Sequence, residues 1–188
     1  LAVIFLAWES RAKEPIIPLS LFKNHTFSLT SGLGAVIGAG MFGAIVMIPL
    51  YMQVVKGYGA TEAGLKLIPL MLGIVSTSIF SGKAISRTGK YKRFPIAGTA
   101  IMSLGILAMA TLKADTPYWQ VAIFAITVGV GLGLSMQTIV IALQNAVDFK
   151  DMGIATSSNT FFRSLGSVFG TALFGSILTN RLGHYIEA

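Results

Sequence analysis

Long apolar stretches alternate with short polar stretches along the chain. Segments 24–55 and 116–147 contain no Lys, Arg, Asp or Glu. A helix needs roughly 20 mostly apolar residues to cross a hydrocarbon layer of about 30 Å. Strands of a membrane barrel alternate apolar and polar residues with a period of two, and these stretches do not. The pattern therefore predicts an all-α membrane protein.

We expect a transmembrane bundle over 27–179, made of five spans with short connections. The approximate limits of the spans are 27–53, 63–82, 94–112, 118–143 and 154–179. Residues 1–26 are interpreted as the end of a preceding span followed by a linker, and 180–188 as an extracytoplasmic segment that leads to a final span. Because the chain begins without Met and inside the apolar stretch LAVIFLAW, we expect it to be part of a longer protein.

The composition agrees with membrane insertion and narrows the function. Charged residues make up 11% of the chain, whereas soluble domains carry about 25%. The net charge is +7, but the basic residues lie between apolar stretches rather than on a soluble face, which argues against nucleic-acid binding. There is no Cys, and His25 and His184 lie at opposite ends. We therefore expect no metal site, no cofactor and no catalytic activity.

Basic residues are concentrated in alternate connections, which predicts an orientation. The connections 9–26, 83–93 and 144–153 carry more Lys and Arg than 54–66, 113–117 and the segment after 180. Cytoplasmic loops of membrane proteins are enriched in these residues. The first group of connections is therefore expected in the cytoplasm.

The most specific motif lies in GKAISRTGKYKR, residues 82–93. Gly82, Ser86, Arg87, Gly89 and Lys90 follow the order G-x-x-x-(D)-R-x-G-(R/K). This order resembles the loop between the second and third helices of each half of the major facilitator superfamily, where it takes part in gating. Ser86 occupies the acidic position of the motif, so we expect a weaker cytoplasmic latch.

Flanking segments extend the resemblance to nearly the whole chain. They are EPIIPLSLFKNHTFSL, IPLYMQVVKGYGATEAGLKLIPLMLG and LQNAVDFKDMGIATSSNTFFRSLGSVFG. They look like the C-terminal half of the fourteen-span drug:proton antiporters of the EmrB/QacA type. The resemblance implies a multi-pass protein of a bacterial inner or plasma membrane that exports amphipathic drugs in exchange for protons by alternating access. It also implies a missing N-terminal half that carries the protons, and a periplasmic adaptor protein as a candidate partner.

Candidate cavity residues come from polar side chains inside the expected spans. A buried amide without a partner is costly, so Gln53, Gln137, Gln144 and Asn159 are expected to face protein or a water-filled cavity. The resemblance implies that the first, second, fourth and fifth helices of the bundle line this cavity. Met41, Phe42 and Tyr51 would add an adaptable apolar wall, and ordinary packing is the alternative for each of them.

Arg163 is the ionisable residue that lies well inside an expected span. An intramembrane charge indicates function by default, but the long side chain could also reach the cytoplasmic interface. We expect Arg163 to face the cavity or the bundle interior, because Gly166 and Gly170 fall on the same side of the helix.

Glycines inside the spans predict close helix packing. Gly129 and Gly133 recur in one span, and Gly166 and Gly170 form a GxxxG pair in another. The segment 38–43 also spells GxGxxG, but a dinucleotide-binding motif follows a strand and opens a helix, and this segment lies inside an expected helix. These glycines are interpreted as packing positions too.

Acidic residues are confined to the connections and the span ends. They are Glu9, Glu14, Glu62, Asp115, Asp148, Asp151 and Glu187. A proton-coupled pump needs a titratable group inside the membrane, so we expect that this chain alone cannot carry protons. The alternatives are a transporter of the same superfamily for a siderophore, sugar or lipid precursor and, less favoured for lack of a selectivity-filter motif, a channel.

Overall fold

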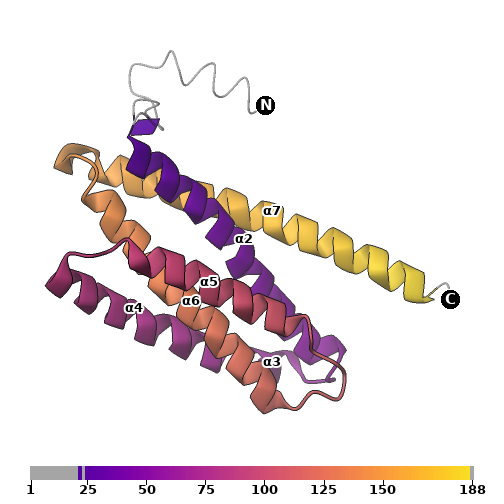
Figure 1. Ribbon diagram of the computed structural model, residues 1–188. Coiled ribbons are helices and arrows are strands. Elements are labelled where there is room, and N and C mark those ends of the chain that lie inside the picture. Colours follow the sequence, from indigo (N-terminus) through magenta and orange to yellow (C-terminus); the bar gives the residue numbers. More distant parts are fainter. Residues whose placement is uncertain (1–20, 23, 187–188) are drawn as a thin grey trace, which may run out of the picture.

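The structure is a computed structural model that describes residues 21–22 and 24–186 (Figure 1). The expected end of a preceding span and most of the linker before residue 26 lie outside the described residues. The main elements are α2 (His25–Val54), α3 (Ala60–Leu65), α4 (Ile68–Thr88), α5 (Arg93–Met109), α6 (Tyr118–Gln144), the short 3-10 helix η2 (Phe149–Asp151) and α7 (Met152–Ile186).

Asn24 starts α2 and also ties it to a distant connection. Its side-chain oxygen accepts hydrogen bonds from the backbone N–H of Thr26 at 2.9 Å and of Phe27 at 3.4 Å. Two of the free N–H groups of the first turn are thereby satisfied. The amide nitrogen of Asn24 donates to the carbonyl oxygen of Ala146 at 2.6 Å. This residue therefore joins the start of α2 to the connection between α6 and α7.

One expected span consists of two helices. The sequence predicts a single helix over 63–82, whereas the structure has α3 and α4 with Lys66 and Leu67 between them. Pro69 explains the break, because a proline ring clashes with the carbonyl group four residues earlier. That residue is Leu65, the last residue of α3. Pro69 itself lies in the first turn of α4, where its missing N–H costs nothing.

Several helix limits also differ from the expected ones. The connection predicted at 83–93 is shorter, because α4 continues to Thr88 and α5 begins at Arg93. The helix α5 ends at Met109 rather than at 112, while α7 continues to Ile186 through most of the segment expected beyond the last span. Propensity alone places helix ends poorly, since apolar and basic residues both prolong a helix readily.

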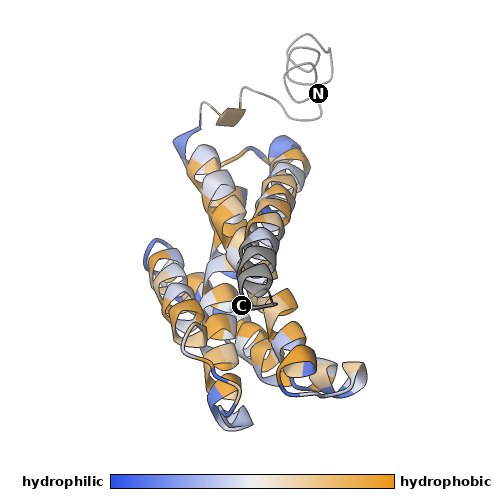
Figure 2. Cartoon of the chain, turned by 90° about the vertical axis from the view of Figure 1, so that its right-hand side faces the viewer, coloured by the Kyte–Doolittle hydropathy of each residue, from blue (hydrophilic) through white to orange (hydrophobic). Residues whose placement is uncertain are grey.

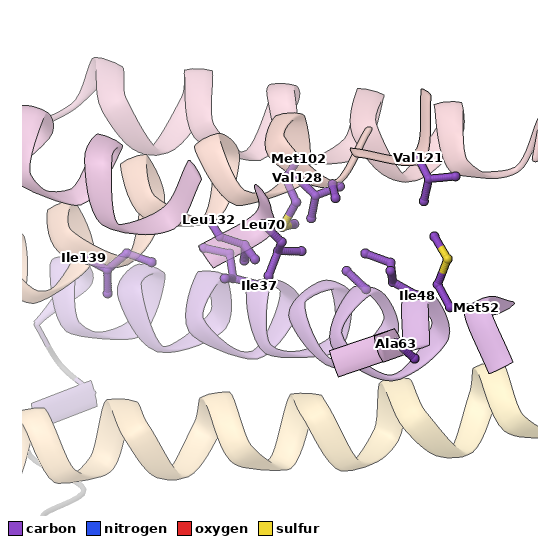
Figure 3. Packing of buried hydrophobic residues seen from close by; sticks show 12 residues of the cluster. Ile37, Ile48, Met52, Ala63, Leu70, Met102, Val121, Val128, Leu132 and Ile139 are labelled. Atoms are coloured by element: carbon purple, nitrogen blue, oxygen red, sulfur yellow. The ribbon is translucent and has the colours of Figure 1, made fainter. Parts of the chain in front are cut away.

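The helix α6 occupies the centre of the bundle. It packs against α4 and α5 and also contacts α2, which in turn packs along α7 (Figure 1). Buried apolar side chains join α2 to α4, α5 and α6, among them Ile37, Leu70, Met102 and Leu132 (Figure 3). The bundle therefore consists of α6 packed between α4 and α5, with the pair of α2 and α7 attached to it through α2.

The surface of the bundle is apolar between polar ends. Among the described residues, three helical segments are long and apolar enough to cross a membrane, namely His25–Val54, Ala60–Thr88 and Tyr118–Gln144. Figure 2 shows hydrophobic residues all along the helices. Many of them lie on the outside of the bundle, among them Leu72, Phe80 and Leu107, which are each more than 60% exposed. Water disfavours such a surface and lipid does not. The prediction of an all-helical membrane protein is confirmed.

Candidate functional site

The motif residues form the end of α4 and the turn after it. Gly82, Ser86 and Arg87 lie in the last turns of the helix, and Gly89 closes it with φ at 67°. Glycine adopts this left-handed conformation without strain. The N–H of Gly89 donates to the carbonyl oxygen of Ile85 at 2.8 Å. The backbone position that requires glycine is therefore Gly89.

The surroundings of Gly82 and Ser86 do not require these residue types. A Cβ on Gly82 would make an ordinary contact with the Cγ of Gln137, at 3.7 Å. Ser86 donates its hydroxyl to the carbonyl oxygen of Gly82 at 2.9 Å. The serine that stands at the acidic position is thus hydrogen-bonded inside its own helix.

The turn after α4 is strongly basic. It surrounds a hollow of about 280 Å³ lined by Gly89, Lys90, Tyr91, Lys92 and Arg93. The ion pairs found in the described part of the chain join Lys66 to Glu62 and Lys150 to Asp148. Within the described residues, the basic side chains of this turn form no ion pair, so they are free to bind other anions.

The contact between α2 and α7 holds two of the candidate residues. Asn159 is 7% exposed, and its side-chain nitrogen donates to the carbonyl oxygen of Thr30 at 2.9 Å. Arg163, one turn later, is half-buried, and its Cγ lies 3.1 Å from the position that a Cβ on Gly38 would take. The amide of Asn159 is thus used within the protein, and the stem of Arg163 packs on α2.

Small residues let α2 and α7 approach each other closely beyond Arg163. Gly166 faces the backbone of Ala35, and a Cβ on Gly170 would lie 2.6 Å from the Cα of Ala39. Both glycines are buried. A side chain at either position would meet backbone atoms that cannot rotate away, so the backbones of α2 and α7 lie in direct contact.

The helix α6 has the same kind of contact with its other neighbours. Gly129 faces the backbone of Leu70, and Gly133 faces that of Ile74, both on α4. On the side of α5, a Cβ on Gly131 would lie 2.5 Å from the carbonyl oxygen of Gly98. Glycines thus allow the backbone of α6 to lie directly against the backbones of α4 and α5.

The remaining candidate residues do not gather into one pocket with Asn159 and Arg163. Met41 and Tyr51 pack against the main hydrophobic core, and Gln137 lies half-buried beside Gly82. The other candidates are exposed, namely Phe42, Gln53 and Gln144. The residues expected to share a cavity therefore lie on several faces of the described chain.

An apolar cavity lies beside the candidate residue Tyr51. Its volume is about 350 Å³, and it lies between the last turns of α2, the end of α5 and the start of α6. Its lining consists of Met47, Ile48, Leu50, Tyr51, Val54, Val55, Met109, Leu112 and Val121. The hydroxyl of Tyr51 donates to the carbonyl oxygen of Lys113 at 2.6 Å. No periodic signal distinguishes these residues in helices that are apolar all round.

Comparison with known sequences identifies the family. The family model described as "Major Facilitator Superfamily" matches residues 5–171. The chain belongs to the Major Facilitator Superfamily. This superfamily consists of membrane transporters, which agrees with the apolar helices of the bundle and sets the chain apart from enzyme families.

Relatives within the Major Facilitator Superfamily include named drug transporters. The chain is 38% identical over 184 residues to the multidrug transporter protein MdtP of Bacillus subtilis, covering 98% of this chain and 34% of that protein. It is 36% identical over 178 residues to a tetracycline resistance determinant of Streptomyces rimosus, covering 95% and 51%. An uncharacterized MFS-type transporter of Mycobacterium tuberculosis is 40% identical over 182 residues, covering 96% and 26%. The chain therefore spans between about a quarter and about half of the length of these relatives.

Proposed function

We propose that this chain is part of a transporter that exports amphipathic drugs in exchange for protons. The observation that carries the proposal is the similarity to MdtP and to the tetracycline resistance determinant across nearly the whole chain. The fourteen-span EmrB/QacA type remains our preferred branch of the superfamily. The bundle of α2 to α7 would then be one of two halves that enclose the substrate.

The glycine contacts support movement by alternating access. Where Gly166 and Gly170 meet Ala35 and Ala39, backbone touches backbone and no long side chains interlock. A small rotation of α7 against α2 therefore breaks few side-chain contacts, while the close approach keeps the pair together. Arg163 and Asn159 lie on this same contact, so a movement of α7 would also displace the polar residues.

The basic turn supports an orientation with Gly89 in the cytoplasm. Lys90, Lys92 and Arg93 lack ion-pair partners in the described chain, and positive residues near membrane ends favour the cytoplasmic side. Anionic lipid headgroups would neutralise them. Gly89 then supplies a short turn that lets α4 and α5 tilt separately, which is a gating role consistent with the motif.

The proton-binding acid is proposed to lie outside residues 1–188. The acidic residues that the structure describes lie in α3, in η2 or in connections, and none is in the long helices. An acid in a preceding half of the transporter would serve instead.

A cellular export assay tests the proposed substrates. The full open reading frame that encodes residues 1–188 is expressed in bacteria without their own major drug exporters, and loss of a preloaded fluorescent lipophilic cation is followed. We expect faster loss than in cells with an empty vector, little gain with Gly166→Leu, and the full gain with the matched variant Gly153→Ala. Dye retention equal to that of the empty vector, with the protein present in the membrane, would contradict drug export.

A further inference from the structure

At the end of the bundle opposite the Gly89 turn, Lys66 places its ammonium group between two tyrosine rings. The Nζ atom lies 4.3 Å from the ring centroid of Tyr58 and 4.2 Å from that of Tyr118. It also lies 3.4 Å from Oε1 of Glu62, and the Lys66 side chain is 18% exposed. Two aromatic faces and one carboxylate therefore surround a single cation.

The walls around this cation are held in place without the Lys66 side chain. The backbone N–H of Tyr58 donates to the carbonyl oxygen of Met52 at 3.0 Å. The hydroxyl of Tyr118 donates to the backbone carbonyl oxygen of Lys66 at 3.3 Å. Both rings also pack against the main hydrophobic core. If the Lys66 side chain turned outward, the rings would keep their positions.

A lysine is not the cation that suits these walls best. Its ammonium group has three N–H donors and is strongly hydrated, whereas tyrosine faces offer an electrostatic attraction and poor hydrogen-bond acceptors. An ammonium group whose hydrogens are replaced by alkyl groups has no donors to leave unsatisfied. Aromatic faces bind quaternary ammonium groups for this reason, and Glu62 supplies a negative charge beside them.

We propose that Tyr58, Tyr118 and Glu62 form a binding cage for alkylated ammonium groups, in which Lys66 is a tethered competitor that turns outward when a ligand enters. The proposal rests on these contacts and not on the export function. The ligand group could belong to a free organic cation or to a choline lipid headgroup. Both present the same alkylated nitrogen to the cage.

The test measures whether a quaternary ammonium ion releases Lys66. The full open reading frame is placed in nanodiscs of phosphatidylglycerol, which contain no quaternary ammonium. Acetylation of individual lysines by a water-soluble reagent is followed by mass spectrometry with and without tetramethylammonium. Lys56 and Lys113 lie at the same end of the bundle outside the cage and serve as internal references; Lys56 donates to the carbonyl oxygen of Ala114 at 2.6 Å.

We expect saturating tetramethylammonium to raise the acetylation rate of Lys66 about tenfold relative to these lysines, while an equal concentration of potassium leaves it unchanged. Nanodiscs of phosphatidylcholine distinguish the source of the ligand. If Lys66 is already reactive there before tetramethylammonium is added, the lipid headgroup occupies the cage. If it becomes reactive only on addition, the ligand is a free cation, and either result supports the cage.

A variant provides a second measurement. Lys66→Ala should bind tetramethylammonium about tenfold more tightly than the wild type, as measured by broadening of the ligand's proton NMR signal. Lys56→Ala should bind like the wild type, and Lys66→Ala with Tyr118→Leu should lose binding. An unchanged Lys66 acetylation rate in both kinds of nanodisc would overturn the proposal and leave the cluster as a structural clamp. The acetylation measurement uses the wild-type protein, so it tests the proposed cage even if Lys66→Ala does not fold.

Discussion

Replacing Gly166 by alanine should destabilise the protein, because the added methyl group meets the backbone of α2. A Cβ there would lie 2.5 Å from the carbonyl carbon of Ala35 and 2.6 Å from its Cα, whereas ordinary contacts begin at 3.4 Å. The helices would have to separate by at least about 0.9 Å. Overpacking of this kind costs about 1–3 kcal/mol. Separation of the helices would also weaken the hydrogen bond from Asn159 to Thr30, which adds about 0.6 kcal/mol.

Alanine is also a better helix former than glycine by about 1 kcal/mol, so the expected net loss is about 0.6–2.6 kcal/mol. The assay is reversible unfolding in mixed micelles with increasing denaturing detergent. Gly153→Ala is the matched control in the same helix, because a Cβ there meets nothing within 4 Å. It should be neutral or stabilising by up to about 1 kcal/mol. If Gly166→Ala were as stable as Gly153→Ala, the packing of α7 on α2 described here would be wrong.

Substitutions of Gly89, Asn159 and Asn24 test three further features of the structure. Gly89→Val should cost about 1–2 kcal/mol because of the left-handed backbone, and Gly89→Asn less; equal detergent stability of both variants and the wild type would contradict that turn. Asn159→Ala should cost about 0.6–1.7 kcal/mol in the same unfolding assay through loss of the bond to Thr30, and a cost no larger than that of the exposed Asn145→Ala would argue against the bond. Asn24→Ala should cost about 1 kcal/mol and speed hydrogen exchange in the first turn of α2, which peptide-level exchange measurements can detect; unchanged exchange would exclude the cap.

The long helices could be predicted because a long apolar stretch without charges can cross a membrane only as a helix. Apolar stretches without charge correspond to α2 and α6, since every backbone group in lipid must be hydrogen-bonded within the helix. The break before α4 was predictable in principle as well, because Pro69 acts on Leu65 through local sterics. The end of α4 at Thr88 was harder to predict. Basic residues in the last turn of a helix interact favourably with the helix dipole and so allow the helix to continue.

The arrangement of side chains around each helix could not be predicted in the same way. When a helix is apolar on all sides, periodicity does not tell which face meets lipid and which meets protein. The sequence therefore left open whether Asn159 faces protein or a cavity, and in the structure its amide nitrogen donates to the carbonyl oxygen of Thr30 on α2. The cluster around Lys66 joins Tyr58 to Tyr118, which are far apart in the sequence, and only the packing of α6 against the connection after α2 brings them together.

Transport in vesicles with a controlled pH gradient shows whether drug export is coupled to protons. The full open reading frame is reconstituted, a gradient is imposed, and movement of a fluorescent lipophilic cation is followed before and after a proton conductor collapses the gradient. We expect the cation to move against its own concentration gradient and to stop when the gradient of protons collapses, and we expect no proton-driven movement with residues 1–188 alone. Movement that is unaffected by the collapse, or proton-driven export by residues 1–188 alone, would contradict it.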